Sequence, residues 1–120
     1  MKLKEVVEVV QGTVLTRGSD LDLEVKYCGA MDLMSDALAY LPPGCMLLTG
    51  LKTIQTIRTA EMAYVTAILF VRGKMPDSET IQLAEELGIP LIRTNFGMFE
   101  SCGRLYQGGM SSVPLTRRYP

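Results

Sequence analysis

Two carboxylates stand four residues apart in the segment VKYCGAMDLMSDALAYLPPG, which covers residues 25–44. Helical spacing would place Asp32, Ser35 and Asp36 on one face, opposite the apolar residues of the same segment. Such a face could bind a small ligand, a cation or a neighbouring subunit. Alternatively, Asp32 caps the helix and Asp36 points into solvent, because two like charges at this spacing repel only weakly. The residues alone leave both interpretations open.

Polar or small residues also follow other predicted strands. In an open α/β sheet, ligands bind beyond the carboxyl ends of the strands, where helix N-termini present free N–H groups. The segment TGLKT resembles a phosphate-binding turn, but it lacks the GxxxxGK[ST] spacing that wraps a phosphate chain. A charged turn, Arg72-Gly73-Lys74, could hold an anion. The candidate ligand-binding residues are Gly29, Asp32, Ser35, Asp36, Thr49, Gly50, Arg72 and Thr94.

The composition argues against several chemistries. The 120 residues include no His, so the usual general base and the commonest transition-metal ligand are missing. Cys28, Cys45 and Cys102 are odd in number and widely spaced, which favours free thiols in a reducing compartment over a disulfide or a metal site. No cofactor and no catalytic residue are therefore expected. A Mg²⁺-dependent enzyme using Asp32 and Asp36 is an alternative, provided that water or substrate completes the oxygen shell.

Charge and hydropathy limit the partners. The net charge is −1, the basic residues are scattered and Trp is absent, a pattern that does not favour a nucleic-acid binder. Glu5 interrupts any apolar run near the N-terminus, and no stretch approaches the ~20 apolar residues of a membrane span. We therefore expect a cytoplasmic protein without nucleic-acid or membrane contacts.

Hydrophobic spacing predicts alternating strands and helices. A first helix begins near Leu3 and ends before Gly12, and a second covers residues 32–40. A third covers residues 53–64, with Ile54, Ile57 and Tyr64 inward. The continuous apolar run VTAILFV predicts a central strand covered on both faces. The predicted strands cover residues 13–16, 24–28, 45–48, 65–71 and 89–94.

Two more helices complete the pattern. One is capped by Asp77 and ended by Gly88. The other is capped by Thr94 or Asn95 and carries an i, i+4 ion pair, Glu100–Arg104. Phe99, Cys102, Leu105 and Tyr106 are predicted to lie on one side of this last helix.

Strands that alternate with helices imply a single α/β domain with a mostly parallel sheet of about four to five strands flanked by helices. We place this domain at residues 1–107. Residues 108–120 are predicted to form a polar C-terminal tail, which includes Arg117-Arg118 and could dock on a partner subunit.

The chain resembles the DRTGG domain family over almost its whole length. The resemblance rests on MKLKEVVEVVQGTVLT, DLMSDALAY and AILFVRGKMPDSETIQLAEELGIPLIRTNFGMFESCGRLY. The later half also resembles the N-terminal, non-catalytic domain of the HPr serine kinase/phosphorylase. The name-giving motif is poorly kept: Asp22 matches its Asp, Leu23 stands for the Arg and Lys26 for the Thr. Tyr27 and Cys28 replace the paired glycines and remove their backbone freedom.

The resemblance implies a non-catalytic regulatory or ligand-sensing module. It also implies a homodimer that binds a nucleotide-like or other small anionic ligand. The alternative that it suggests is a protein-interaction adaptor for an anaerobic, hydrogenase-type redox enzyme system. In that case the face with Asp32 and Asp36, or the Arg117-Arg118 tail, would contact the partner enzyme.

Overall fold

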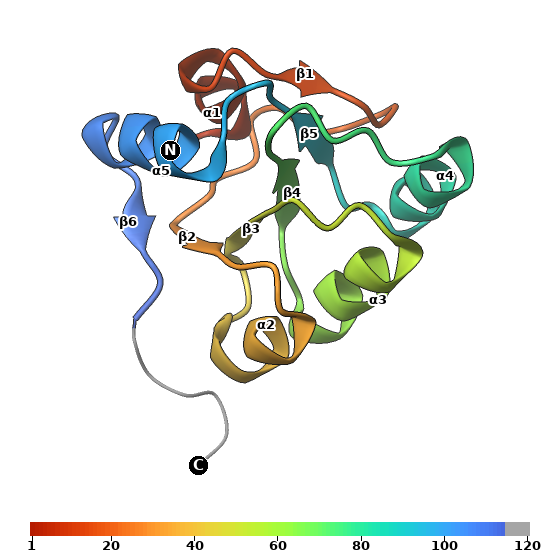
Figure 1. The fold of residues 1–120 in the computed structure, drawn as a ribbon. Helices are drawn as coiled ribbons and strands as arrows, with labels where there is room; N and C mark the ends of the chain where they lie inside the picture. Colours follow the sequence, from red (N-terminus) through yellow and green to blue (C-terminus); the bar gives the residue numbers. More distant parts are fainter. Residues whose placement is uncertain (115–120) are drawn as a thin grey trace.

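The computed structural model describes residues 1–114, so the Arg117-Arg118 pair lies outside the described residues. The described strands are β1 (Thr13–Val14), β2 (Tyr27–Ala30), β3 (Met46–Thr49), β4 (Ala67–Phe70), β5 (Leu91–Arg93) and β6 (Ser111–Ser112). They form one sheet in the order β1-β5-β4-β3-β2-β6 (Figure 1). Neighbouring strands are parallel except for β1, which pairs antiparallel with β5. The mostly parallel α/β fold is confirmed, with one strand more than expected.

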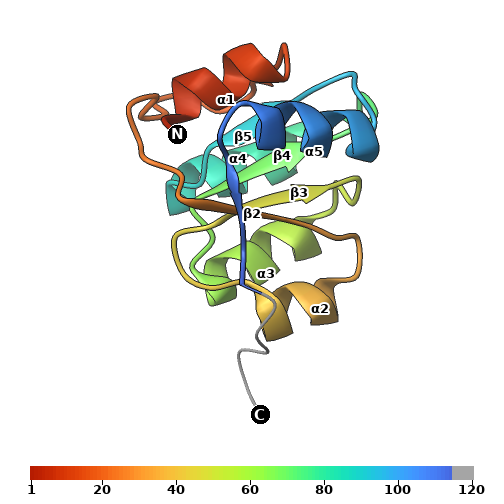
Figure 2. The ribbon, with the colours of Figure 1, turned by 90° about the vertical axis from the view of Figure 1, so that its left-hand side faces the viewer.

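Helices cover both faces of the sheet. They are α1 (Leu3–Val9), α2 (Met34–Tyr40), α3 (Ile54–Ala63), α4 (Ser78–Leu87) and α5 (Met98–Gln107). In Figure 2, α1 and α5 lie above the sheet, and α2 and α3 lie below it. The strands from β2 to β5 follow one another across the sheet, so crossovers of one hand bring α2, α3 and α4 to the same face. The chain then returns over the opposite face through α5 and reaches β6 at the far edge.

The core consists of two apolar clusters separated by the sheet. All residues of β3 and β4 are buried. Leu47 and Ile68 belong to the cluster under α2, α3 and α4, whereas Leu48 and Leu69 belong to the cluster under α1 and α5. Successive side chains of a strand point to opposite faces, so a strand covered on both sides must be apolar throughout. The predicted central position of the VTAILFV run is confirmed.

Several local predictions for the helices are confirmed. The Asp77 side chain accepts a hydrogen bond from a backbone N–H in the first turn of α4 at 2.8 Å. Gly88 ends this helix in the left-handed conformation, with φ of 70°. After α1, by contrast, Gln11 takes the left-handed conformation. The neighbouring Gly12 leaves room for Ile92, whose Cγ2 would lie 2.8 Å from a Cβ at that position.

Two predicted helix starts are wrong. The residue that caps α2 is Leu33, so Asp32 precedes the helix and does not share a helical face with the residues after it. The residue that caps α5 is Gly97, instead of Thr94 or Asn95. In both cases the polar side chain that was expected to cap is used elsewhere. The Asp32 carboxylate bonds to the loop after β3, and the Thr94 hydroxyl bonds to the end of α1.

Two large side chains that were predicted to face inward, in α3, and two that were predicted to share one apolar side of α5 are exposed. In α5, the buried positions are Ser101 and Leu105, which places the predicted aromatic pair on the outer side. In α3, the tyrosine comes after the last helical residue and has left-handed backbone angles, so it turns away from the core. The exposed fractions are 93% for Phe99, 75% for Tyr106, 70% for Tyr64 and 37% for Ile54.

The segment after α5 is attached to the sheet where a polar tail was expected to begin. Met110 is only 6% exposed and belongs to the cluster under α1 and α5. Ser111 and Ser112 pair with the start of β2, and the Val113 N–H donates to the Cys28 carbonyl at 3.2 Å. Within residues 1–114, no helix is long and apolar enough to cross a membrane.

Candidate functional site

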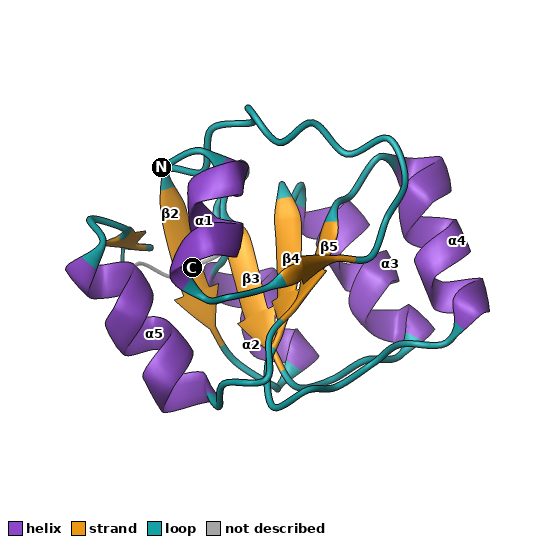
Figure 3. Ribbon diagram, turned by 90° about the horizontal axis from the view of Figure 1, so that it is seen from above, coloured by secondary structure: helices purple, strands orange, loops and turns teal. Residues whose placement is uncertain are grey.

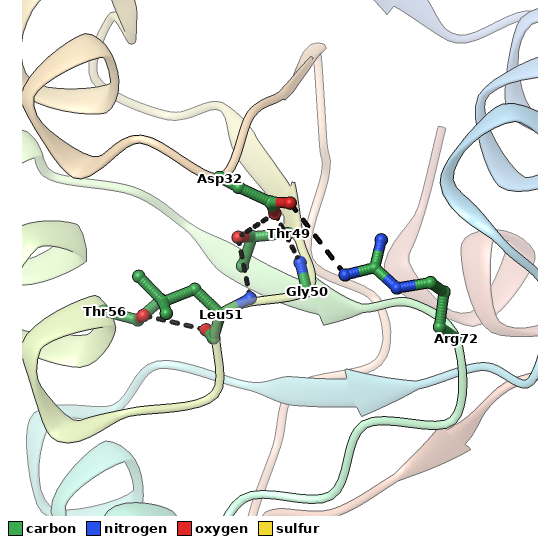
Figure 4. Close-up of polar contacts among 6 residues, drawn as sticks. All are labelled: Asp32, Thr49, Gly50, Leu51, Thr56 and Arg72. Atoms are coloured by element: carbon green, nitrogen blue, oxygen red, sulfur yellow. Dashed lines mark hydrogen bonds and ion pairs between the residues drawn. The ribbon is translucent and has the colours of Figure 1, made fainter.

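Four predicted site residues meet at the carboxyl edge of the sheet. Asp32 follows β2, Thr49 ends β3 and is followed by Gly50, and Arg72 comes shortly after β4. Because β2, β3 and β4 are parallel neighbours, the residues after them lie side by side (Figure 4). We call Asp32, Thr49, Gly50 and Arg72 the edge cluster.

The Asp32 carboxylate joins the three strand ends. Its Oδ1 accepts hydrogen bonds from the Thr49 hydroxyl at 2.9 Å and from the Gly50 N–H at 2.7 Å. Its Oδ2 lies 3.9 Å from a guanidinium nitrogen of Arg72. The Gly50 N–H is the main reason why the pKa of Asp32 lies below its ordinary value. Partial burial opposes this shift, whereas Thr49 and Arg72 favour it, so the carboxylate is charged at neutral pH.

The turn after β3 is fixed by two threonines. The Thr49 hydroxyl accepts from the Leu51 N–H at 3.1 Å while it donates to Asp32. The buried Thr56 hydroxyl, in the first turn of α3, donates to the Leu51 carbonyl at 2.8 Å. Hydroxyls that bond to nearby backbone in this way stabilise turns. The Gly50 N–H therefore has a fixed direction toward the carboxylate.

The backbone at Arg72 is strained, and hydrogen bonds hold it. Arg72 and Gly73 are both left-handed, with φ of 59° and 67°. For a residue with a side chain this conformation costs on the order of 1 kcal/mol. The Arg72 N–H donates to the Phe96 carbonyl at 2.7 Å, and the Gly73 N–H donates to the Thr94 carbonyl at 2.8 Å. The loop after β5 thus fixes the direction in which the Arg72 side chain leaves the sheet.

Gly50 provides the space that the Arg72 side chain occupies. A Cβ at residue 50 would stand 2.8 Å from the central guanidinium carbon of Arg72 and closer still to one of its nitrogens. The guanidinium therefore lies across the turn, beside Asp32, as Figure 4 shows. The Arg72 side chain is 47% exposed, so part of this cation faces solvent.

Two helices present uncapped N-termini at the same edge. Both α3 and α5 start after a strand end and have no side-chain cap, in contrast to α4, where Asp77 fills this role. Uncapped N–H groups and the positive end of the helix dipole attract anions. A hollow of about 330 Å³ opens between the starts of α3 and α4, and its lining includes Lys52, Ile54 and Met75. The edge thus combines cationic, N–H and apolar groups with the Asp77 carboxylate, which caps α4 and also lines this hollow.

Comparison with known proteins defines the family. Residues 5–107 match the model of the DRTGG domain. The chain belongs to the DRTGG domain family. A similar solved structure contains the CBS and DRTGG domains of the regulatory region of Clostridium perfringens pyrophosphatase, complexed with its activator diadenosine tetraphosphate. The TM-score is 0.73 at 16% identity, over 98% of this chain and 51% of the other, so this chain spans about half of that one. No curated protein matches.

The other predicted site residues of this DRTGG domain lie outside the edge cluster. Gly29 is buried in β2, where a Cβ would stand 2.5 Å from a methyl carbon of Leu41, so it serves packing against the segment after α2. Ser35 and Asp36 are exposed in the first turn of α2. Thr94 is buried, and its hydroxyl donates to a backbone carbonyl at the end of α1 at 2.6 Å. The predicted set therefore divides into one cluster and four separate positions.

Sequence reasoning missed the residues that support the cluster. Thr56 fixes the turn after β3, and Phe96 holds the Arg72 backbone through its carbonyl. The Phe96 ring also carries the Arg104 guanidinium, 4.1 Å from its centroid. The sequence carried one signal for the cluster itself, though not for these supporting residues: Asp32 and Arg72 have opposite charges and follow the two strands on either side of β3.

The described part of this DRTGG domain contains no cluster of metal-ligating side chains. Among residues 1–114, no three His, Cys, Asp or Glu side chains gather closely enough to hold a metal ion. Cys28 and Cys102 are free thiols. Burial, with smaller effects of Cys102 and Cys45, raises the pKa of Cys28 to about 12, so this thiol is protonated and unreactive at neutral pH.

Proposed function

We propose that this DRTGG domain is a non-catalytic regulatory module that binds a small anionic, nucleotide-like ligand at the edge cluster and acts as a homodimer. The observation that carries the ligand proposal is the half-exposed Arg72 guanidinium, which is held across Gly50 by a strained backbone. Backbone strain at a fixed cation costs stability, and such strain is concentrated at functional sites.

The ion pair between Arg72 and Asp32 can give way to a ligand. Its N–O distance is 3.9 Å and both side chains are about half exposed, so it contributes little to stability. A phosphate offers the guanidinium two parallel charge-assisted hydrogen bonds, which are shorter and stronger. Asp32 then keeps its bonds to Thr49 and Gly50 and continues to fix the turn.

The surroundings of Arg72 suit the rest of a nucleotide. The N–H groups at the uncapped starts of α3 and α5 can donate hydrogen bonds to further phosphate oxygens. The apolar side chains of Ile54 and Met75 line the neighbouring hollow and can contact a base. The complex of the pyrophosphatase regulatory region with diadenosine tetraphosphate supports a ligand that combines phosphates with adenine.

Thermal unfolding tests the ligand proposal. The protein is titrated with diadenosine tetraphosphate, ATP, AMP, adenosine and inorganic phosphate. A ligand that binds only the folded state raises the free energy of unfolding by about 2.7 kcal/mol when its concentration is a hundred times its Kd. We expect a phosphate-bearing adenine nucleotide to raise the melting temperature and adenosine to have less effect.

Two variants and a control locate the site. Arg72→Ala removes the cation, and Gly50→Ala displaces it. Both should therefore raise the apparent Kd for the nucleotide at least tenfold and reduce the nucleotide-induced rise in melting temperature. Arg58→Ala is the matched control, since Arg58 is also exposed and paired with an acidic residue, Glu61. Equal shifts in all four proteins, or no shift with any ligand, would contradict the proposal, and so would turnover of the bound nucleotide.

Two alternative functions were considered from the sequence, a Mg²⁺-dependent enzyme and a protein-interaction adaptor. The Mg²⁺-dependent enzyme was predicted to use Asp32 and Asp36 together, but Asp32 precedes α2 and bonds to the turn after β3, whereas Asp36 is exposed in the first turn of α2. The adaptor for a redox enzyme system stays a prediction, and co-purification from the native host would test it.

A further inference from the structure

The outer side of α5 carries the two most exposed large apolar side chains among residues 1–114. Phe99 is 93% exposed and Tyr106 is 75% exposed. They stand seven residues apart, so both lie on one face of the helix. Figure 3 shows α5 at the margin of the fold, with no other element on its outer side. Large exposed aromatic residues that share a face mark an interaction surface.

A glycine lies between these aromatic residues on the same face. Gly103 is four residues after Phe99 and three before Tyr106, in the interior of α5. A Cβ at this position would have no neighbour within 4 Å, and its φ is not positive. Glycine inside a helix is less stable than alanine there. Nothing within the described fold requires this glycine, whereas close approach of another helix would.

We infer that the face formed by Phe99, Gly103 and Tyr106 is the contact between two copies of this chain, with the two α5 helices antiparallel about a two-fold axis near Gly103. The face is suited to its own copy because the aromatic residues stand almost symmetrically about this glycine. An antiparallel partner brings Phe99 of one copy against Tyr106 of the other, and the glycines allow the backbones to approach.

Charge and shape support a second copy as the occupant. Glu100 and Arg104, which flank the face, pair within the helix at 2.9 Å, so two copies do not oppose like charges. Beside α5, an apolar groove of about 300 Å³ separates the helix from β2 and β6. Its lining includes Cys28, Cys102 and Tyr106, and it can receive Phe99 of the other copy. The inference rests on the proposed homodimer and names its surface.

Sedimentation equilibrium over a concentration series measures the dimer dissociation constant. Phe99→Ser and Gly103→Arg should each raise it at least tenfold, without lowering the melting temperature of the monomer, because neither side chain is packed in the fold. Tyr64→Ser is the matched control, since Tyr64 is 70% exposed but lies on the opposite face of the sheet. Its dissociation constant should equal that of the unmodified chain.

Cross-linking tests the position of the axis. In a Cys102→Ala background, Gly103→Cys should form an intermolecular disulfide under mild oxidation, whereas Tyr64→Cys should not. A monomer at all concentrations would overturn both this inference and the homodimer. A dimer that is insensitive to Phe99→Ser and Gly103→Arg would overturn only this surface. Nucleotide-induced thermal shifts report on the edge cluster separately from either outcome.

Discussion

Asp32 shows how one side chain can connect three strands. Its position after β2 made it a candidate helix cap, but the structure uses its carboxylate to fix the turn after β3. An acceptor on one loop that satisfies a backbone donor on the next does, between loops, what a capping residue does within a helix. The negative charge also holds Arg72 near the turn. A single carboxylate therefore positions the cation that we propose binds the ligand.

The contribution of Asp32 to stability should depend on pH. Its pKa is lower in the folded protein than the ordinary value of 3.8, so its charge stabilises the fold above pH 3.8. This contribution is lost as the pH falls through the folded pKa, because the protonated form no longer gains from the Gly50 N–H and Arg72. Asp32→Asn keeps an acceptor oxygen but removes the charge. At pH 7 it should lower the free energy of unfolding by less than about 1 kcal/mol, since the group is half exposed.

Urea denaturation of both proteins between pH 7 and pH 2.5 provides the measurement. The difference between the two unfolding free energies should shrink below pH 3.8 and approach zero once Asp32 is protonated. Using a difference removes the effect of other carboxylates with lowered pKa values, such as Asp77. A difference that stays constant over this range would show that the charge of Asp32 does not contribute.

At the scale of elements, backbone conformation sets opposite roles for two glycines. Gly88 ends α4 with φ of 70°, whereas Gly103 has helical angles inside α5, and neither would crowd a Cβ. The same substitution should therefore have opposite effects. Gly88→Ala should destabilise the protein by about 1 kcal/mol, because it places a side chain in the left-handed region. Gly103→Ala should stabilise it by up to about 1 kcal/mol.

Urea denaturation in a Phe99→Ser background measures both effects in a protein without the proposed dimer contact. If Gly103→Ala destabilised this background, the glycine would have a role inside the fold, and the argument for close approach of a second α5 would fail. If Gly88→Ala had no effect, the end of α4 would have to tolerate a side chain by adjusting its backbone.

The elements themselves could be predicted from local patterns, because apolar spacing and glycine positions act within one segment. The VTAILFV run gave the buried β4, and Asp77 gave the start of α4. The inner face of α5 could not be predicted in this way. Phe99 and Tyr106 are apolar, so composition favours burial, but the buried residues of the helix are Ser101 and Leu105. Which face packs depends on the entry of the chain from β5, a tertiary property.

For the candidate site, the sequence could predict the residues but not the contacts between them. Strand ends in a parallel sheet share an edge, so Asp32, Thr49, Gly50 and Arg72 could be named from the sequence. The contacts among these residues could not be predicted, because they join separate loops. Asp32 bonds to residues 17 and 18 positions later, and Arg72, from the loop after β4, lies near Asp32 in the loop after β2. The helical spacing that grouped Asp32 with residues of α2 failed because the helix begins after Leu33.

At the scale of the molecule, the sheet is completed by a segment that the sequence placed in a tail. The chain leaves β5, crosses one face in α5 and returns to pair beside β2, so β6 lies at the opposite edge from β1. Residues far apart in the sequence, at positions 27–28 and 111–112, become neighbours. This closing strand also forms one wall of the groove beside α5.

Met110 should be the residue that anchors this closing strand. It is 6% exposed and lies in the cluster under α1 and α5, together with Leu105. Met110→Ala should lower the free energy of unfolding by about 2 kcal/mol, through lost burial and an unfilled space.

A chain that ends at Gly109 loses this anchor and the pairing with β2, so it should be destabilised by at least as much. A chain that ends at Pro114 keeps both and is the control. Urea denaturation of the three variants and the full chain measures these effects. If the chain that ends at Gly109 were as stable as the one that ends at Pro114, residues 1–107 would form the complete folding unit, and β6 would be dispensable to it.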